Sequence, residues 1–261
     1  MLKRFINDTK KYFHYSIVSA RSQLKSEVAS SYLNWIWWVL DPFCFMLIYT
    51  FIFGYVFSAK EPYFPVFIFI GLSMWDFFNR TIAGSVKMVK NNKPIVSKVY
   101  LPKYILILTR MWVNAFKMMI SFGIVLAMML AFRVPFSIQI IYFPCIILAL
   151  MSVTFGFSTF LLHYGVFVED LSNVIAIAIR MLFYLTGIFY NVETRMPKPY
   201  GKLLVRYNPM AFLITTMRRV LLYGEVPHRK LILFWFLFGI AVSALGIRKI
   251  YKNENSYVKV I

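Results

Sequence analysis

The sequence is poor in acidic residues, histidine and cysteine, and each shortage excludes a class of function. Only 10 of the 261 residues are Asp or Glu, and none are spaced as a catalytic pair of carboxylates would be. The three histidines, His14, His163 and His228, lie far apart. The two cysteines, Cys44 and Cys145, both lie within apolar runs, so they form neither a metal-ligand pattern nor a disulfide framework.

Nucleotide-binding and hydrolase motifs are also missing. The sequence contains no G-x4-G-K-[ST] loop, which cradles nucleotide phosphates, and no H-E-x-x-H or G-x-S-x-G pattern. We therefore predict that the chain is not an enzyme and binds no cofactor. Energy for any work that the chain performs must therefore come from a partner or an ion gradient.

What the sequence has in abundance is apolar and basic residues. It is 60% hydrophobic and 19% aromatic, its mean hydropathy is +0.67, and its net charge is +19. A nucleic-acid-binding protein would not place its basic residues between apolar runs of about 20 residues, so we exclude that class. The first apolar run begins near Trp35 and is long enough to span, so we predict no signal peptide. The composition predicts an all-α membrane protein made of one helical bundle.

Residues 87–103, which we call the lysine loop, orient this bundle. The segment KMVKNNKPIVSKVYLPK holds five lysines, two prolines and no acid, and apolar runs flank it on both sides. Such a loop cannot lie in hydrocarbon, and short Lys/Arg-rich loops stay on the cytoplasmic side. We expect both chain termini on that side too, in a multi-pass membrane protein.

Six transmembrane helices can be counted outward from the lysine loop. The predicted spans are residues 35–57, 65–86, 104–130, 138–162, 172–190 and 231–247, the last of them somewhat short. The predicted domains are a cytoplasmic interface segment (1–34), a transmembrane domain (35–248) and a cytoplasmic tail (249–261). The inner loop after span four, residues 163–171, holds no Lys or Arg.

Residues 191–230, which we call the outer hairpin, do not follow the rule that Lys/Arg-rich loops lie on the cytoplasmic side. They hold eight basic residues on the predicted outer side, against six in the N-terminal segment, five in the lysine loop and four in the tail. Asn208-Pro209 is typical of a helix start, and that helix should end at Gly224 with Arg218 and Arg219 projecting from it. We expect a re-entrant or interfacial hairpin, whose charge would suit an anionic cargo, an anionic cell wall or lipid headgroups.

The N-terminal segment 1–34 is basic and amphipathic. Its Phe, Tyr, Ile and Leu residues alternate with six Lys or Arg residues. We predict a helix lying on the inner membrane face. It would either touch a cytoplasmic partner or anchor the chain to anionic lipid.

Several charged residues fall inside the predicted spans, where they are costly and need polar neighbours. They are Asp41, Asp76, Arg80, Arg110, Lys117 and Arg180. Asp76 and Arg80 are spaced i, i+4, so they form either a buried structural pair or a pair lining a hydrated path. Arg110, Asn114 and Lys117 make one polar stripe that should face protein or water.

Aromatic residues crowd span one and the end of span five. Phe45, Tyr49 and Phe53 fall on one helical face. With Phe183, Tyr184 and Tyr190 they are our candidates for a channel lining, because aromatic rings stack on the apolar faces of sugars. The alternative is contact with lipid and ordinary packing.

Four stretches resemble the permease subunits of bacterial ABC exporters for cell-surface polysaccharide, such as O-antigen, teichoic acid or capsule. They are Leu33-Asn34-x-x-Trp37-x4-Pro42, Gly71-Leu72-x-x-Trp75-x-Phe77-Phe78, Asn92-x-x-Ile95-x-x-Lys98-Val99-Tyr100-Leu101-Pro102-Lys103, and Gly187-Ile188-Phe189-Tyr190 followed by Asn208-Pro209. The resemblance covers most of the chain, and the lysine loop is its most specific part. Asn34 replaces the family's usual glycine, and Glu169-Asp170 stands where the family often has Arg-Asp.

The resemblance implies a homodimer in the bacterial cytoplasmic (inner) membrane that works with two ATPase subunits, on which ATP and Mg would be bound. The N-terminal segment and the lysine loop would contact the ATPase, with coupling assigned to Lys90, Lys93, Pro94, Lys98, Tyr100, Pro102 and Lys103. The outer hairpin, with Asn208, Pro209, Arg218 and Arg219, would help to gate the exit. The expected function is export of a lipid-linked polysaccharide. The alternatives are a drug or small-lipid ABC exporter and an ATPase-independent secondary transporter.

Overall fold

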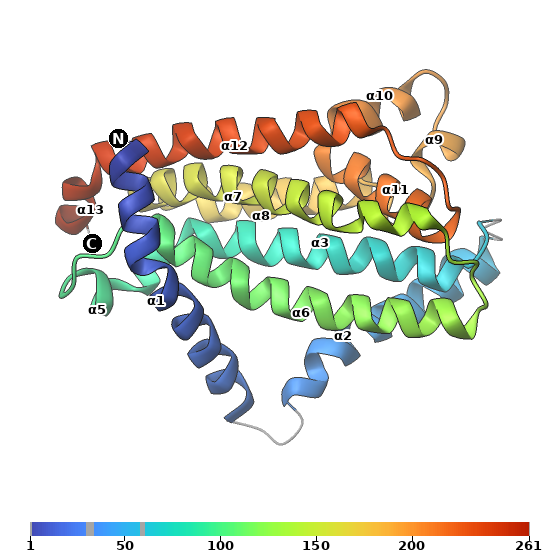
Figure 1. Cartoon of the computed structure of the whole chain (residues 1–261), viewed down its shortest axis with the longest axis horizontal. Helices are drawn as coiled ribbons and strands as arrows, with labels where there is room; N and C mark the ends of the chain where they lie inside the picture. Colours follow the sequence, from blue (N-terminus) through green and yellow to red (C-terminus); the bar gives the residue numbers. More distant parts are fainter. Residues whose placement is uncertain (1, 30–33, 58–60, 261) are drawn as a thin grey trace.

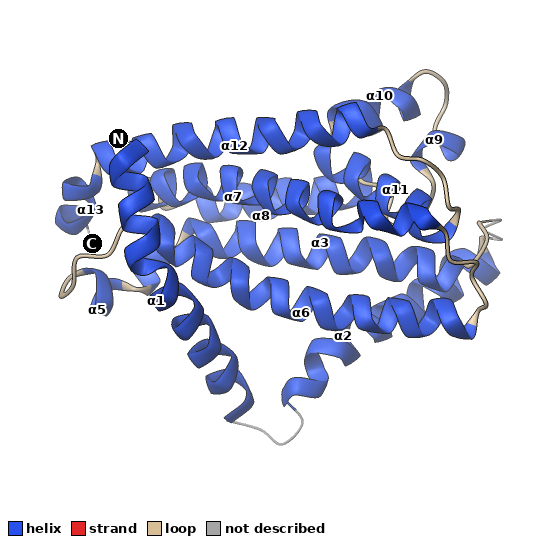
Figure 2. Ribbon diagram, viewed as in Figure 1, coloured by secondary structure: helices blue, strands red, loops and turns tan. Residues whose placement is uncertain are grey.

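The computed structural model describes residues 2–29, 34–57 and 61–260, and within those ranges it contains helices and no strand (Figures 1 and 2). Leu33 of the first motif and Lys60 lie outside the described residues. The long helices run side by side (Figure 1). Both termini lie at the same end as α5, which we call the lysine-loop end, and α9 and α10 lie at the opposite, hairpin end.

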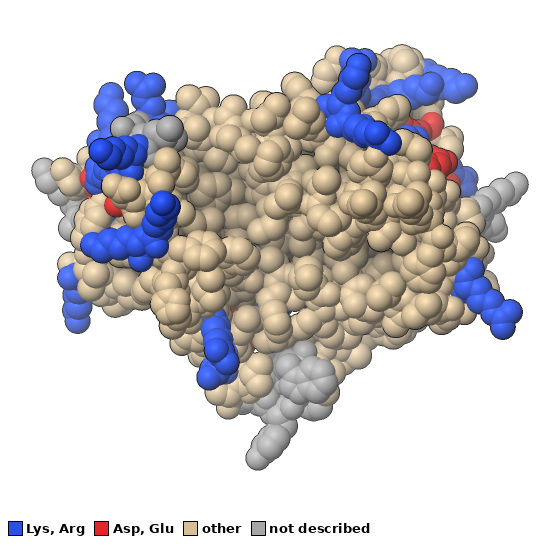
Figure 3. All heavy atoms as spheres, viewed as in Figure 1, with Lys and Arg blue, Asp and Glu red and all other residues tan. Residues whose placement is uncertain are grey.

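Five helical segments among the described residues are long and apolar enough to cross a membrane, in agreement with five of the six predicted spans. They are α2 (Asn34–Tyr49) continued by the π-helix η1 (Thr50–Val56), α3 (Phe64–Val86), α6 (Tyr104–Ala131), the 3₁₀-helix η2 (Ile138–Tyr142) continued by α7 (Phe143–Phe167), and α12 (Arg229–Lys252). On the face drawn in Figure 3, Lys and Arg gather mostly towards the two ends and leave an uncharged belt between them.

The predicted fifth span differs from the structure. Its helix, α8 (Leu171–Leu185), has 15 residues, which at about 1.5 Å per residue is shorter than a bilayer core of about 30 Å. The chain turns at Gly187, whose φ of +69° lies in the left-handed region that favours glycine. The predicted end at Tyr190 was therefore wrong, and a sixth crossing stays a prediction.

Two further boundaries needed correction. Helix α12 has 24 residues and is not short, because Arg229, Lys230 and the basic residues after Ile247 continue it at both ends. Helix α7 continues to Phe167, so His163 lies within a helix and only residues 168–170 connect α7 to α8.

The lysine loop and the outer hairpin are both built of short helices. The lysine loop contains α4 (Met88–Asn91) and α5 (Lys93–Val96). The outer hairpin contains α9 (Val192–Arg195), α10 (Tyr200–Tyr207) and α11 (Pro209–Leu222). The predicted start of α11 is confirmed, because the Asn208 side chain accepts hydrogen bonds from the backbone N–H groups of Met210 and Ala211.

Helix α3 is the centre of the bundle because it is apolar on nearly all sides. In the most apolar stretch of α3, 78% of the residues are buried, whereas in the most apolar stretch of α2–η1 only 11% are buried. Helices α2, α6, α7, α8 and α11 all pack on α3. Helix α1 (Leu2–Ala29) packs on α6, and the tail helix α13 (Glu254–Val260) packs on α7.

Helices α7 and α12 form the most extensive helix pair in the described chain, and a glycine permits their close approach. A Cβ atom on Gly239 would lie 2.6 Å from backbone atoms of Ser152 and Val153. We expect Gly239→Ala to destabilise the protein by about 1–3 kcal/mol through overpacking, seen as a lower thermal unfolding midpoint in detergent. Gly123→Ala is the matched control, since a Cβ there meets nothing within 4 Å. Equal midpoints for the two variants would contradict the packing account.

Candidate functional site

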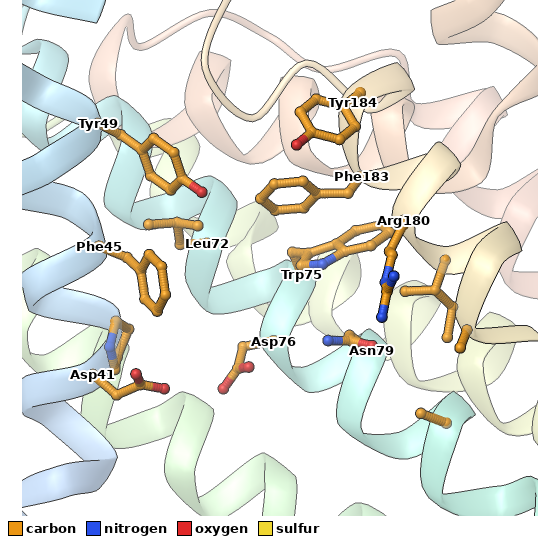
Figure 4. Close-up of a pocket in the computed structure, with 14 residues that line it drawn as sticks. Asp41, Phe45, Tyr49, Leu72, Trp75, Asp76, Asn79, Arg180, Phe183 and Tyr184 are labelled. Carbon is orange, nitrogen blue, oxygen red and sulfur yellow. The ribbon is translucent and has the colours of Figure 1, made fainter. Parts of the chain in front are cut away.

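A groove of about 500 Å³ opens between α2, α3 and α8 (Figure 4). We call it the candidate groove. Polar side chains lie towards the lysine-loop end of these helices and aromatic rings towards the hairpin end. Its lining residues are Asp41, Pro42, Phe45 and Tyr49 of α2, Leu72, Trp75, Asp76, Asn79 and Ala83 of α3, and Ala176, Ile179, Arg180, Phe183 and Tyr184 of α8.

The polar part of the groove is organised around Arg80. Its Nε donates to Oδ2 of Asp76 at 2.7 Å, and its Nη2 donates to Oδ2 of Asp41 at 3.3 Å. The predicted pairing of Asp76 with Arg80 is confirmed. Both side chains are 38% exposed, so the pair is not fully buried. Asp41 and Asp76 line the groove, and Arg80 lies beside it.

Arg180 completes the polar part from α8. It makes no hydrogen bond and no ion pair with any residue that the structure describes. Figure 4 shows its guanidinium lying near Asn79, across the groove from Asp41. The groove therefore offers both carboxylate acceptors and guanidinium donors to a molecule that enters it.

The aromatic part of the groove brings together four of the six predicted lining residues. Phe45 stacks on Tyr49 with ring centroids 6.0 Å apart, and Phe183 packs edge-on against Tyr184 at 5.5 Å. Trp75, which sequence reasoning used only as part of a motif, packs 5.5 Å from Phe183. These rings come from all three helices that bound the groove.

The other two predicted lining residues, Phe53 and Tyr190, lie beside the groove and do not line it. Phe53 stacks almost parallel to Phe189, with centroids 5.0 Å apart, and Tyr190 donates its hydroxyl proton to the Tyr184 carbonyl at 2.8 Å. Phe189 also lies 4.2 Å from Tyr49. The buried Phe189 therefore joins the aromatic surface of α2 to the turn after α8, a role that sequence reasoning missed.

Arg218 lies buried between α11, α3 and that turn, so the prediction that it projects from its helix was wrong. It is 2% exposed. Its guanidinium donates to three carbonyls, those of Phe67 at 2.9 Å, Gly187 at 2.8 Å and Ile188 at 2.8 Å. It also lies over the Phe67 ring, 3.5 Å from the centroid. Gly71 leaves the space for it, because a Cβ there would lie 2.5 Å from Nη2.

Arg219 does not project freely either. It is half-buried and forms ion pairs with Glu193 and with Glu225, the latter at 3.5 Å. Nearby, Tyr223 donates its hydroxyl proton to Glu61 at 3.3 Å. Glu61, Glu193 and Glu225 therefore all have partners in the outer hairpin.

The polar stripe of α6 lies away from the candidate groove and faces protein, as predicted. Asn114 donates to Thr81 Oγ1 of α3 at 2.9 Å. The Lys117 ammonium pairs with Glu27 of α1 at 2.6 Å and lies over the Trp38 ring. Arg110 is half-buried beside Gly84, and its Nε has no hydrogen-bond partner among the described residues.

The lysine loop is held from both sides and keeps an exposed tip. Lys90 pairs with Glu169 at 2.9 Å, which ties the loop to the connection after α7 and lowers the pKa of the Glu169 carboxyl. Tyr12 donates to the Tyr100 carbonyl at 3.2 Å. Lys98 and Val99 are exposed at the tip.

Two predicted coupling residues, Pro102 and Lys103, are buried, and burial lowers the pKa of the Lys103 ammonium. They cannot contact a partner directly unless the loop rearranges. Any part that they play in coupling would act through the packing of the loop. The exposed tip is therefore the part of the loop best placed to meet another protein.

Both ends of the chain close around this loop. Arg4 pairs with Glu254 at 2.7 Å, and Glu254 also accepts a hydrogen bond from the Tyr100 hydroxyl at 3.2 Å. The hydroxyl of the buried Tyr257 lies 2.7 Å from Nδ1 of His163. Helix α1, the lysine loop and the tail therefore form one hydrogen-bonded unit at the lysine-loop end.

The chain is similar in sequence to several known proteins. No family model matches the chain. It is 24% identical over 250 residues to the O-antigen export system permease protein RfbA of Klebsiella pneumoniae, covering 95% of both chains. It is 23% identical over 227 residues to the protein of the same name in Myxococcus xanthus, covering 87% of both.

A second kind of relative is the polysialic acid transport protein KpsM of Escherichia coli, which is 20% identical over 239 residues, covering 90% of this chain and 91% of the relative. The similarity thus extends through the spans, the lysine loop and the outer hairpin. The chain is therefore a multi-pass membrane protein and a homologue, over nearly its whole length, of proteins named for O-antigen export and polysialic acid transport.

Proposed function

We propose that the chain is the membrane subunit of a homodimeric ABC exporter that moves a lipid-linked polysaccharide of O-antigen, teichoic-acid or capsule type out of the bacterial cytoplasm. The observation that carries this proposal is the similarity, over nearly the whole chain, to permeases named for O-antigen export and polysialic acid transport. The chemistry of the candidate groove supports it.

The candidate groove suits a sugar chain better than an apolar drug. Sugars present apolar C–H faces that stack on rings and hydroxyls that need hydrogen-bond partners. The groove has Tyr49, Phe183 and Tyr184 towards one end and Asp41 and Arg180 towards the other. A polymer sliding along α2, α3 and α8 could exchange one sugar for the next without losing these contacts.

Dimer formation would turn this open groove into a closed path. Only 11% of the apolar window of α2–η1 is buried within the chain, although this segment carries a row of aromatic rings. A second copy facing α2 and α8 would cover these rings and supply the opposite wall. Six crossings per copy would follow if α8 and the outer hairpin together traverse the membrane.

ATP would act from the lysine-loop end, which we place in the cytoplasm together with both termini. ATP and Mg would be bound on the partner, while the tip of the lysine loop and α1 would receive its movement. The hydrogen bonds between the lysine loop, α1 and the tail then carry that movement to α6, which directly follows the loop.

Deleting the gene for this chain tests the function. We expect the surface polysaccharide to disappear while its lipid-linked precursor accumulates inside the cell, and a tagged copy should restore export and co-purify with an ATPase that carries the phosphate-binding loop. A deletion strain with normal surface polysaccharide but new sensitivity to a drug would favour the small-molecule exporter. Export without any ATPase would favour a secondary transporter.

A further inference from the structure

A second, larger groove lies on the other side of the bundle, beneath α1. It has a volume of about 940 Å³ and is bounded by α1, α2, α6 and α7. We call it the α1 groove. In Figure 1, α1 diverges from the bundle and α2 returns to it. None of its lining residues belongs to the candidate groove.

The walls of the α1 groove are almost entirely apolar. They include Ile17, Leu24 and Val28 of α1, Trp112 and Met119 of α6, and Met151 of α7. Ile17 is 43% exposed and Met119 60% exposed. A trough of this kind, beside an amphipathic helix, suits a flexible hydrocarbon chain.

The charge at the rim is positive and uncompensated. Arg21 and Lys25 line the groove one helical turn apart, both are exposed, and neither forms an ion pair with a residue that the structure describes. Glu27, the acid closest to them along α1, is already neutralised by Lys117 at 2.6 Å and accepts a hydrogen bond from Trp38 at 3.0 Å. Arg21 and Lys25 therefore place two positive charges, without an ion-pair partner among the described residues, beside an apolar groove.

We propose that the α1 groove is a binding site for an anionic phospholipid of the membrane leaflet on the lysine-loop side. One acyl chain lies in the trough between α1 and α6, and the phosphate lies between Arg21 and Lys25. Basic residues one turn apart can both donate to one phosphate, and basic pockets between helices select anionic headgroups. The bound lipid fills the space between α1 and the bundle, and so holds the helix at its angle.

Other occupants fit the observations less well. A peptide segment would bring backbone polar groups into a trough whose walls offer them almost no partners. A zwitterionic lipid would bring an ammonium group that competes with Arg21 and Lys25 for its own phosphate and is repelled by both cations. A second copy of the chain would bring its own basic α1 against this one, since α1 carries six Lys or Arg and two acids in its 28 residues.

The test uses the purified full chain, stripped of lipid in detergent and titrated with phosphatidylglycerol or with phosphatidylethanolamine of the same acyl chains. Native mass spectrometry counts the bound lipids. We expect phosphatidylglycerol to bind about tenfold more tightly, and Arg21→Ala with Lys25→Ala to remove that preference. The matched control is Lys10→Ala with Lys11→Ala, which removes the same charge from the same helix away from the groove.

A second variant separates the trough from the surface charge. Ala115→Trp fills the α1 groove from α6 and leaves both cations in place, so we expect it to lower binding of phosphatidylglycerol about tenfold. The proposal is overturned if the two lipids bind equally, if the control pair lowers binding as much as the groove pair, or if the filled groove still binds normally. Cross-linking between the α1 helices of two copies across this face would also overturn it. None of these readouts depends on transport of a polysaccharide.

Discussion

Replacing Arg218 by methionine is expected to lower export at least about tenfold and to lower the thermal unfolding midpoint. Three buried carbonyls, on Phe67, Gly187 and Ile188, would lose their donor, and a charged hydrogen bond contributes about 1.5–3 kcal/mol. Their release frees the turn that carries Phe189, whose ring packs against Tyr49 of the candidate groove. The measurements are surface polysaccharide in cells and thermal unfolding of the purified protein.

Two variants show whether the geometry of Arg218 matters or only its charge. Arg218→Lys keeps the charge but cannot serve three carbonyls in one fork, so we expect only partial rescue. Arg219→Met changes the neighbouring residue and removes its ion pairs with Glu193 and Glu225. Such partly exposed pairs contribute about 0–1 kcal/mol to stability, so we expect export to stay near normal. Equal losses in Arg218→Met and Arg219→Met would count against the account of the turn.

Reversing the charge at the tip of the lysine loop is expected to uncouple export from ATP hydrolysis. The double variant Lys98→Glu with Val99→Asp alters two exposed residues without touching the buried part of the loop. At a protein interface, charges of the wrong sign cost several kcal/mol, so export should fall at least about tenfold while the chain stays in the membrane. Surface polysaccharide and the amount of co-purified ATPase are the readouts.

The same two kinds of substitution, made at the hairpin end of the protein, provide the control. Lys202→Glu with Leu203→Asp changes an exposed lysine and an exposed apolar neighbour in the outer hairpin. We expect normal recovery of the ATPase with this variant. If Lys98→Glu with Val99→Asp also leaves ATPase recovery and export unchanged, then the tip of the lysine loop is not the site of coupling.

Much of the fold followed from hydrophobic runs and their polar boundaries. Helix α3 begins one residue before its predicted start, ends at the predicted Val86, and is mostly buried, as its many apolar residues predict. The start of α11 could be predicted from Asn208-Pro209, because Asn caps the first N–H groups of a helix and Pro is favoured at its first position. Predictions that depend on local physics alone agreed with the structure.

The end of α8 could not be found in this way, because Gly187 lies inside an apolar run that hides the turn. The burial of Arg218 was missed for a related reason. Arginine is usually exposed, and only the tertiary contact with Gly71 and with the carbonyls after α8 makes a buried guanidinium favourable. A glycine in the middle of the apolar α3 was the one sequence signal of this contact.

The candidate groove was partly predictable. Asp76 and Arg80 pair through their spacing on one helix, and the sequence indicated this. Asp41 joins this pair from another helix and lies 3.3 Å from Arg80. Arg110 and Lys117 face α3 or α1 instead. These contacts depend on how the helices pack. Sequence periodicity does not specify which helices become neighbours.

Site-specific photocross-linking tests most directly whether the candidate groove is the path of the polysaccharide. A photoreactive phenylalanine analogue would replace Phe45 or Tyr184, which line the groove, and in the control Leu237, an exposed residue of α12. In exporting cells, we predict adducts that carry the glycan at positions 45 and 184 and none at 237. Glycan adducts of equal yield at all three positions, or none at 45 and 184 while export continues, would contradict the account.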